Sequence, residues 1–164
     1  MRRSDSIDRQ VLRHLMQEVG LALLQCQHFE NLMVVLLESL ITLGAIDSQG
    51  RTPDEWALHL NDRTAGQLAR QIQRDVDVEG LVEALTDAVG ARNDLAHRFF
   101  LDWMPYAVDP TSVQAALDEL DRITRAIDVA VSLLEPHMVG LATCITGVDL
   151  QAVSVEVRAS LDSA

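Results

Sequence analysis

Residues 113–141 read VQAALDELDRITRAIDVAVSLLEPHMVGL, and the spacing of their apolar side chains decides the fold class. Apolar residues recur every three or four positions, which is the period of one face of an α-helix. They are Val113, Leu117, Leu120, Ile123, Ile127, Val131, Leu134, Met138 and Leu141. We therefore expect a long helix that starts at Asp109-Pro110 or at Thr111 and that Pro136 kinks or restarts.

A second long helix is predicted at the start of the chain, from Ser4 or Asp5 to about Leu43, where Gly44 ends it. Its apolar stripe is Ile7, Val11, Leu15, Val19, Ala22 and Cys26. Residues 32–37 are all apolar, so more than one face of the helix is covered there. Such a helix lies at the centre of a bundle or at a subunit interface, and this favours a dimer.

Between the two long helices the sequence predicts three shorter ones. Thr52 and Thr64 are each followed three residues later by Glu55 or Gln67, which is the capping-box pattern of a helix start. These two helices are expected to end near residues 61–62 and 74. Asp77 is expected to cap the third. The apolar stripe of this third helix is Val78, Leu81, Leu85, Ala88, Leu95 and Phe99.

The composition agrees with helices packed around an aliphatic core. Hydrophobic residues make up 48% of the 164 residues but aromatic residues only 4%, so Leu, Val, Ile and Ala must fill the interior. We predict one all-α domain over residues 1–147, an up-and-down bundle of four to five helices. The tail, residues 148–164, is either a short strand or a frayed helix.

Charge and targeting signals restrict the class of protein. The formal net charge of −12 disfavours proteins that coat nucleic acids through a basic surface. The N-terminus lacks the apolar stretch of a signal peptide, and Glu30 and Glu38 interrupt the apolar residues 29–46. We therefore expect a cytoplasmic protein that does not span a membrane. Cys26 and Cys144 are expected to be buried, reduced thiols.

The third short helix contains one residue that breaks its apolar stripe. Arg92 occupies the phase of Leu85, Ala88 and Leu95, and a buried guanidinium needs a partner, a wet cleft or a ligand. Asn93 and His97 are four residues apart and share one helix face. In a continuous α-helix, Arg92 and His97 are about 140° apart around the axis and about 7.5 Å apart along it.

The segment Arg92-Asn93-Asp94-Leu95-Ala96-His97, followed by Arg98-Phe99-Phe100, resembles the Arg-x4-6-His signature of the HEPN superfamily. The resemblance implies a HEPN-like bundle that dimerises to form a composite cleft. It also implies a metal-independent endoribonuclease, without a cofactor, of the toxin–antitoxin or phage-defence type.

The family pattern implies a role for each matching residue. Arg92 steadies the scissile phosphate and His97 acts as general base or acid, so the products are a 2′,3′-cyclic phosphate and a 5′-hydroxyl. Asn93 orients His97 or holds a phosphate, and Arg98 contacts RNA. A cognate antitoxin resembling a nucleotidyltransferase is implied as a partner. Phe99 stands where some of these toxins carry a Tyr that the antitoxin modifies, which puts that control in doubt.

Alternatives remain open for these residues. In a structural interpretation without catalysis, Arg92 pairs with Glu30 or Glu38 from the first helix, and His97 caps its own helix end. The rival function is a non-catalytic helical module that binds a protein partner or a nucleotide.

Two further groups of side chains bear on binding. One interpretation is a basic rim that binds RNA, formed by Arg63, Arg70, Arg74 and Arg98. The interpretation that we favour is that these arginines form surface ion pairs with acidic residues. The isolated histidines and the two cysteines lack the spacing of a metal site.

Overall fold

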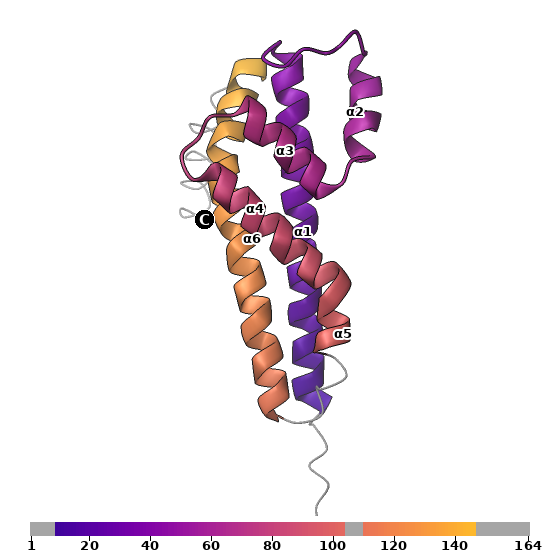
Figure 1. Ribbon diagram of the computed structural model, residues 1–164, viewed down its shortest axis with the longest axis vertical. Coiled ribbons are helices and arrows are strands. Elements are labelled where there is room, and N and C mark those ends of the chain that lie inside the picture. Colours follow the sequence, from indigo (N-terminus) through magenta and orange to yellow (C-terminus); the bar gives the residue numbers. More distant parts are fainter. Residues whose placement is uncertain (1–8, 104–109, 147–164) are drawn as a thin grey trace, which may run out of the picture. The chain divides into compact units, whose positions relative to one another are not determined.

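Helices dominate the structure, a computed structural model that describes residues 9–103 and 110–146 (Figure 1). The helical elements are α1 (Arg9–Thr42), α2 (Pro53–Asn61), α3 (Ala65–Asp75), α4 (Leu81–Asn93), the π-helical η1 (Asp94–Phe99), α5 (Phe100–Asp102) and α6 (Pro110–Thr146). Neither described range contains a strand, so the predicted all-α helical bundle is confirmed.

Local signals in the sequence set most of the helix ends. α1 ends at Thr42, and Gly44 then adopts a φ of +73°, a left-handed conformation that glycine adopts without strain. Thr52 and Thr64 both form the predicted capping boxes at the starts of α2 and α3. α6 continues through Pro136, so the predicted restart at this residue is wrong.

Two expectations about single residues are also wrong. Asp77 does not cap α4, because the chain turns at Gly80, which is the N-cap residue with a φ of +76° and offers no side-chain cap. Cys26 is buried as expected but Cys144 is exposed, and both thiols are free. The predicted helix start at residues 4–5 and the predicted tail lie outside the described residues.

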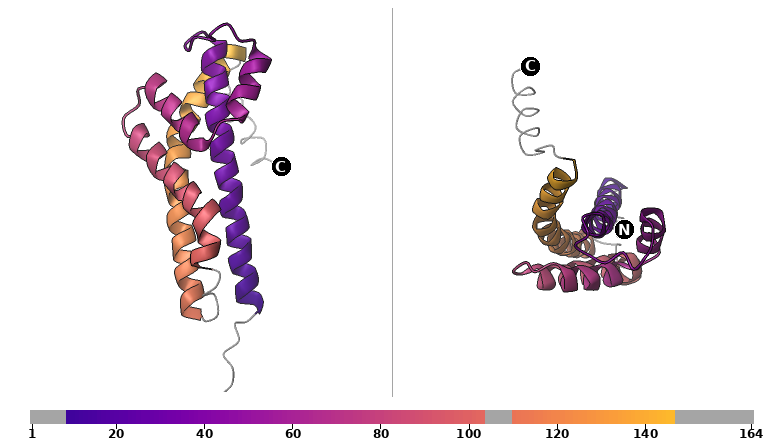
Figure 2. Two further views of the ribbon diagram at one scale, coloured as in Figure 1. Left: turned by 45° about the vertical axis from the view of Figure 1, so that its right-hand side comes forward. Right: turned by 90° about the horizontal axis from the view of Figure 1, so that it is seen from above.

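Contacts divide the chain into two compact units, and the first consists of residues 1–30 and 77–131. Within it, the first part of α1 and the first part of α6 run side by side, and α4 packs across them (Figure 2). Its core is aliphatic apart from two aromatic side chains. The most deeply buried members are Leu15, Phe29, Leu81, Leu85, Leu95, Phe99, Ile123 and Ile127.

The second unit consists of residues 31–76 and 132–164, and it contains α2, α3 and the remaining parts of α1 and α6. Its core includes Met33, Leu36, Leu37, Trp56, Leu60, Leu68, Ile72 and Leu134. The apolar run at residues 32–37 is only partly covered, because Val35 remains 44% exposed.

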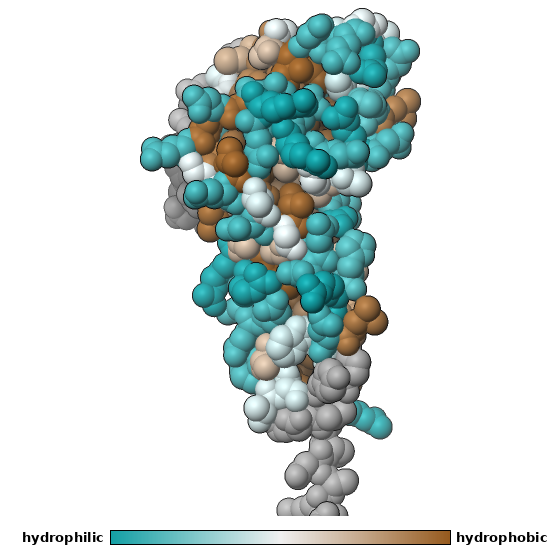
Figure 3. Space-filling model, in the orientation of Figure 1, coloured by the Kyte–Doolittle hydropathy of each residue, from teal (hydrophilic) through white to brown (hydrophobic). Residues whose placement is uncertain are grey.

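The surface carries apolar as well as polar side chains (Figure 3). On α1, the residues from Val19 to Phe29 include no acidic residue and no Arg or Lys, and Leu21 and Leu24 are 55% and 67% exposed. By length and composition alone, α1 and residues 111–145 of α6 pass a test for membrane-spanning helices. Core helices of soluble proteins pass the same test, so this is weak evidence of a membrane protein.

Candidate functional site

The predicted motif lies where α4 passes into the π-helix, inside the first unit. Arg92 and Asn93 are the last residues of α4, and His97 and Arg98 belong to η1. Leu95 and Phe99 of η1 are buried, which anchors this segment in the core. The buried side chains therefore fix the backbone that carries all four predicted site residues.

The π-helix changes the predicted angle between Arg92 and His97. A π turn holds one residue more than an α turn, and such turns occur often at functional sites. The extra residue rotates later side chains back by up to roughly 100°, because each α-helical residue contributes about 100°. Because His97 lies inside the π turn, its angle from Arg92 is smaller than the value of about 140° for a continuous α-helix. Periodicity gave no signal for this turn.

Arg92 has the partner that its place on an apolar stripe requires. Its Nε donates to Oε1 of Glu30, a residue of α1, and the two side chains are 28% and 26% exposed. Of the two glutamates considered from the sequence, Glu30 is therefore the one that pairs. The ion pair holds the guanidinium through one edge, at the boundary between core and solvent.

The outer edge of the same guanidinium faces Asn93. Arg92 Nη1 donates to Oδ1 of Asn93 over 3.3 Å. Arg92 is thus held by a carboxylate and by an amide, and Asn93 contacts the arginine rather than a histidine. The sequence proposal that Asn93 orients His97 has no hydrogen bond to support it among the described residues.

Cys26 is the third side chain that interacts with this ion pair. Burial raises the pKa of the Cys26 thiol to about 11, and Glu30 also raises it while Arg92 lowers it. The thiol is therefore protonated at neutral pH and acts as a small apolar group near the pair. Its position on the stripe of α1 was predicted, but its proximity to Arg92 was not.

His97 lies on the surface of the π-helix. Its side chain is exposed, and within residues 9–103 and 110–146 it has no hydrogen bond or ion pair. The alternative that His97 caps its own helix end therefore has no supporting contact. An exposed imidazole is free to meet a substrate or a second protein chain.

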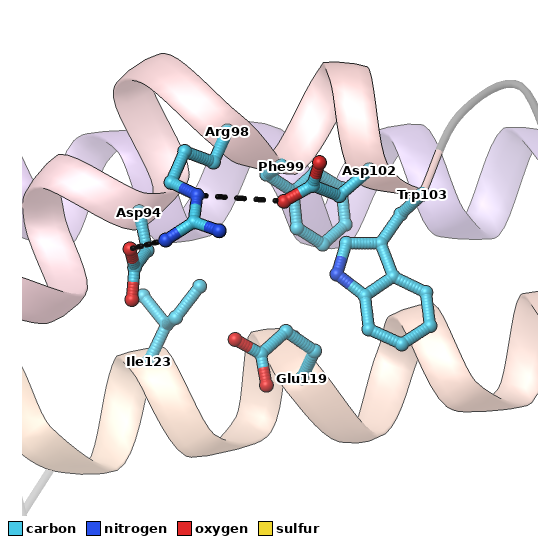
Figure 4. Close-up of a pocket in the computed structure, with 7 residues that line it drawn as sticks. All are labelled: Asp94, Arg98, Phe99, Asp102, Trp103, Glu119 and Ile123. Carbon is cyan, nitrogen blue, oxygen red and sulfur yellow. Dashed lines mark ion pairs between the residues drawn. The ribbon is translucent and has the colours of Figure 1, made fainter.

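Arg98 lies between two carboxylates, one of which, Asp94, also pairs with Arg122. The guanidinium of Arg98 lies 3.8 Å from Asp94 and 3.6 Å from Asp102, one helical turn away on either side (Figure 4). The three side chains line a cavity of about 280 Å³ together with Trp103, which follows Asp102, and with Glu119 from α6 on the opposite wall. Two nearby carboxylates offset the charge of Arg98, which weakens its predicted role as an RNA contact.

The arginines of the predicted basic rim divide between the two units. Arg98 belongs to the first unit, whereas Arg63, Arg70 and Arg74 line a cavity of about 730 Å³ in the second. Of the four arginines, Arg98 forms the surface ion pairs that we favoured. None of the other three lies within 4.0 Å of a carboxylate oxygen of a described residue.

The described residues contain no group of three or more His, Cys, Asp or Glu side chains that could hold a metal ion. No family model, curated protein or solved structure matches the chain. The candidate site therefore rests on the residues themselves and on their geometry.

Proposed function

We propose that this protein is a HEPN-like, metal-independent endoribonuclease that acts as a homodimer with a composite cleft. The observation that carries the proposal is the guanidinium of Arg92, which Glu30 fixes beside a π turn that presents an exposed His97. A fixed guanidinium can stabilise charge on a phosphate and an accessible imidazole can transfer a proton, which are two roles that RNA transesterification uses.

Arg92 would stabilise the negative charge that builds on the phosphate oxygens in the transition state. Because Nε is bound to Glu30, the guanidinium is already oriented before substrate arrives, and only its terminal nitrogens remain for phosphate. Asn93 lies against one of these nitrogens and would be a positioning residue for Arg92. Arg98 would contact the RNA only after exchanging Asp94 or Asp102 for a phosphate.

His97 would move the protons. One imidazole takes the proton of the ribose 2′-hydroxyl while the 2′-oxygen bonds to phosphorus and the bond from phosphorus to the 5′-oxygen breaks. The departing 5′-oxygen takes a proton from a second, protonated imidazole. A monomer contributes one such His97, so a dimer that brings two copies together supplies both the base and the acid.

Exposed apolar side chains beside the motif support dimerisation. Phe100 and Leu101 of α5 follow the π-helix directly and are 42% and 73% exposed. α1 adds the uncharged segment with Leu21 and Leu24 in the same unit. Apolar surface of this kind marks interaction sites, and here it flanks the helix that carries His97.

An RNA cleavage assay in the presence of a chelator tests the proposal. Wild type is expected to cut single-stranded or transfer RNA and to leave 2′,3′-cyclic phosphate ends. His97→Ala and Arg92→Ala should each lose at least about a hundredfold in rate, the usual contribution of one general base or one charge-stabilising donor. His28→Ala and Arg125→Ala are matched controls, since both positions are exposed and lie outside the motif.

The proposal fails if dimeric wild type leaves both RNAs intact, or if the four variants cleave alike. A monomer in sedimentation at micromolar concentration would rule out the composite cleft.

A toxin of this kind would act in the cytoplasm and would be inhibited by a cognate antitoxin. Transfer of AMP to position 99 is not expected, because Phe99 has no hydroxyl and is only 2% exposed.

A non-catalytic module that binds a protein partner or a nucleotide is the second candidate. It is favoured by the net charge of −12 and by the ion pair that offsets the charge of Arg92. If this candidate is correct, any growth arrest caused by induced expression of wild type would also occur with His97→Ala. The ribonuclease proposal requires that His97→Ala no longer arrests growth.

A further inference from the structure

Of the ten arginines within residues 9–103 and 110–146, four form ion pairs and six do not, and three of these six lie around one cavity. All 13 basic residues are arginines. Those that form ion pairs within the described residues are Arg92, Arg98, Arg122 and Arg125, and all four belong to the first unit. The second unit contains Arg63, Arg70 and Arg74, which line one cavity and have no carboxylate partner among the described residues.

Neutral partners hold Arg63 in place. Its Nη1 donates to Oε1 of Gln71 over 2.6 Å, and its Nη2 lies 2.7 Å from Nε2 of His59. Gln71 is only 6% exposed, so this contact fixes the guanidinium firmly. Because a guanidinium can only donate, His59 must accept with Nε2 and is therefore neutral in this arrangement. Arg63 keeps its whole positive charge at a fixed position.

The environment of His59 agrees with that assignment. Its ring packs edge-on against Trp56, with 5.3 Å between the ring centroids. Desolvation, Arg63 and Arg51 all lower the pKa of His59, and Asp62 opposes them. These are the charged groups around the imidazole, and the two arginines outweigh the one carboxylate in their effect on the pKa of His59.

Arg70 and Arg74 extend the basic surface along α3. The buried face of this helix carries Leu68 and Ile72, while both arginines are exposed on the other side. Arg70 Nε donates to the carbonyl oxygen of Gly66 over 3.0 Å, which lays the side chain along the helix. Arg70 and Arg74 lie one helical turn apart, about 6 Å at 1.5 Å per residue, and the contact with Gln71 brings the guanidinium of Arg63 alongside the same helix.

We propose that this surface of α2 and α3, defined by Arg63, Arg70 and Arg74, binds successive phosphates of single-stranded RNA. The three guanidiniums line a cavity of about 730 Å³, which has room for more than one phosphate and so suits a strand better than a single phosphate. The one carboxylate that lines the cavity is Asp62. Arginine binds phosphate bidentately, and such a group reads the backbone and not the sequence. The choice of RNA rests on the proposed ribonuclease function.

Binding is measured with a short labelled single-stranded RNA and the full chain carrying His97→Ala, so that cleavage cannot interfere. Arg70→Gln with Arg74→Gln should weaken binding roughly tenfold at low salt. The slope of log affinity against log salt should become shallower by about 1.4, since each single-strand phosphate contact contributes about 0.7. Both side chains are exposed, so the double variant should keep its helical circular dichroism.

Arg13→Gln with Arg125→Gln is the matched control, because it removes the same charge from exposed positions of the first unit. This control should retain the affinity and the salt slope.

In histidine NMR spectra, RNA should raise the pKa of His59, since a bound phosphate offsets the charge of Arg63. Equal losses in both double variants would overturn the proposal, as would an absence of RNA binding at low salt. If a mononucleotide or inorganic phosphate binds as tightly as RNA, the ligand of this surface is a small phosphate compound, and the proposal of an RNA strand is wrong.

The outcome is separable from that of the proposed function. RNA binding that depends on Arg70 and Arg74 without any cleavage by wild type retains this surface and refutes the nuclease. Cleavage by an otherwise wild-type chain whose KM is unchanged by the Arg70→Gln and Arg74→Gln substitutions retains the nuclease and refutes the surface. If both are correct, the double variant raises KM and leaves kcat within about twofold, because uniform binding is lost.

Discussion

The ion pair between Arg92 and Glu30 makes a quantitative prediction about stability. Exposed pairs contribute about 0.2–1 kcal/mol, whereas removing one partner of a fully buried pair costs about 3–5 kcal/mol. The two side chains are 28% and 26% exposed, so the pair lies between these limits. We expect Glu30→Gln to lower the free energy of unfolding by about 1.5 kcal/mol, and the melting temperature by about 3–6 °C.

A double-mutant cycle isolates this interaction from the other effects of each substitution. The four proteins are wild type, Glu30→Gln, Arg92→Gln and the double variant, unfolded in urea and followed by circular dichroism. The coupling energy should be about 1 kcal/mol or more. The control cycle uses Arg125 and Asp121, which are 3.0 Å apart but 76% and 70% exposed, so its coupling should stay below about 0.5 kcal/mol. Equal coupling energies in the two cycles would refute the view that Glu30 fixes Arg92 at the edge of the core.

Three other properties can be checked separately. Native protein should react with one equivalent of alkylating reagent at the exposed Cys144, while Cys26, whose pKa is raised to about 11, reacts only after unfolding; fast labelling of Cys144→Ser would contradict this. The folded state lowers the pKa of His59, so the unfolded chain binds more protons around that pKa and stability should decline as pH falls from about 7.5 to about 5.5. His59→Gln should flatten this dependence, and an unchanged slope would rule the imidazole out as its cause. Leu24→Glu, at a side chain 67% exposed, should shift the sedimenting species towards monomer without loss of helix, whereas the exposed control Glu83→Gln should not.

Sequence reasoning succeeded where the determining interactions are local. The capping boxes at Thr52 and Thr64 involve residues three apart, so the pattern of residue types contains the whole interaction. Asp77 is a residue type that can cap a helix but has no Glu or Gln three residues later, and it does not cap α4, because Gly80 adopts a left-handed conformation and the helix starts after it. A residue type that can cap a helix does so only where the backbone begins one.

The candidate site was predictable in part. The apolar stripe required a partner for Arg92 and narrowed it to Glu30 or Glu38, but choosing between them needs the packing of α1 against α4. The π turn at Asp94–Phe99 leaves Leu95 and Phe99 buried four residues apart, as in an α-helix, so no apolar pattern reveals it. Its effect on His97 could therefore not be foreseen.

The sequence does not show whether a carboxylate offsets the charge of an arginine. This difference decides whether the arginine only orients a bound group or also attracts anions from a distance. Glu30 fixes Arg92 and also offsets its charge, so this guanidinium contributes orientation and little long-range attraction. Gln71 and His59 fix Arg63 without offsetting its charge, so this one attracts anions as well as orienting them. On a chain of net charge −12, an approaching polyanion is repelled except where such charges remain. If both proposals hold, the salt dependence of KM arises from Arg63, Arg70 and Arg74, and substitution of Arg92 changes kcat while leaving that dependence in place.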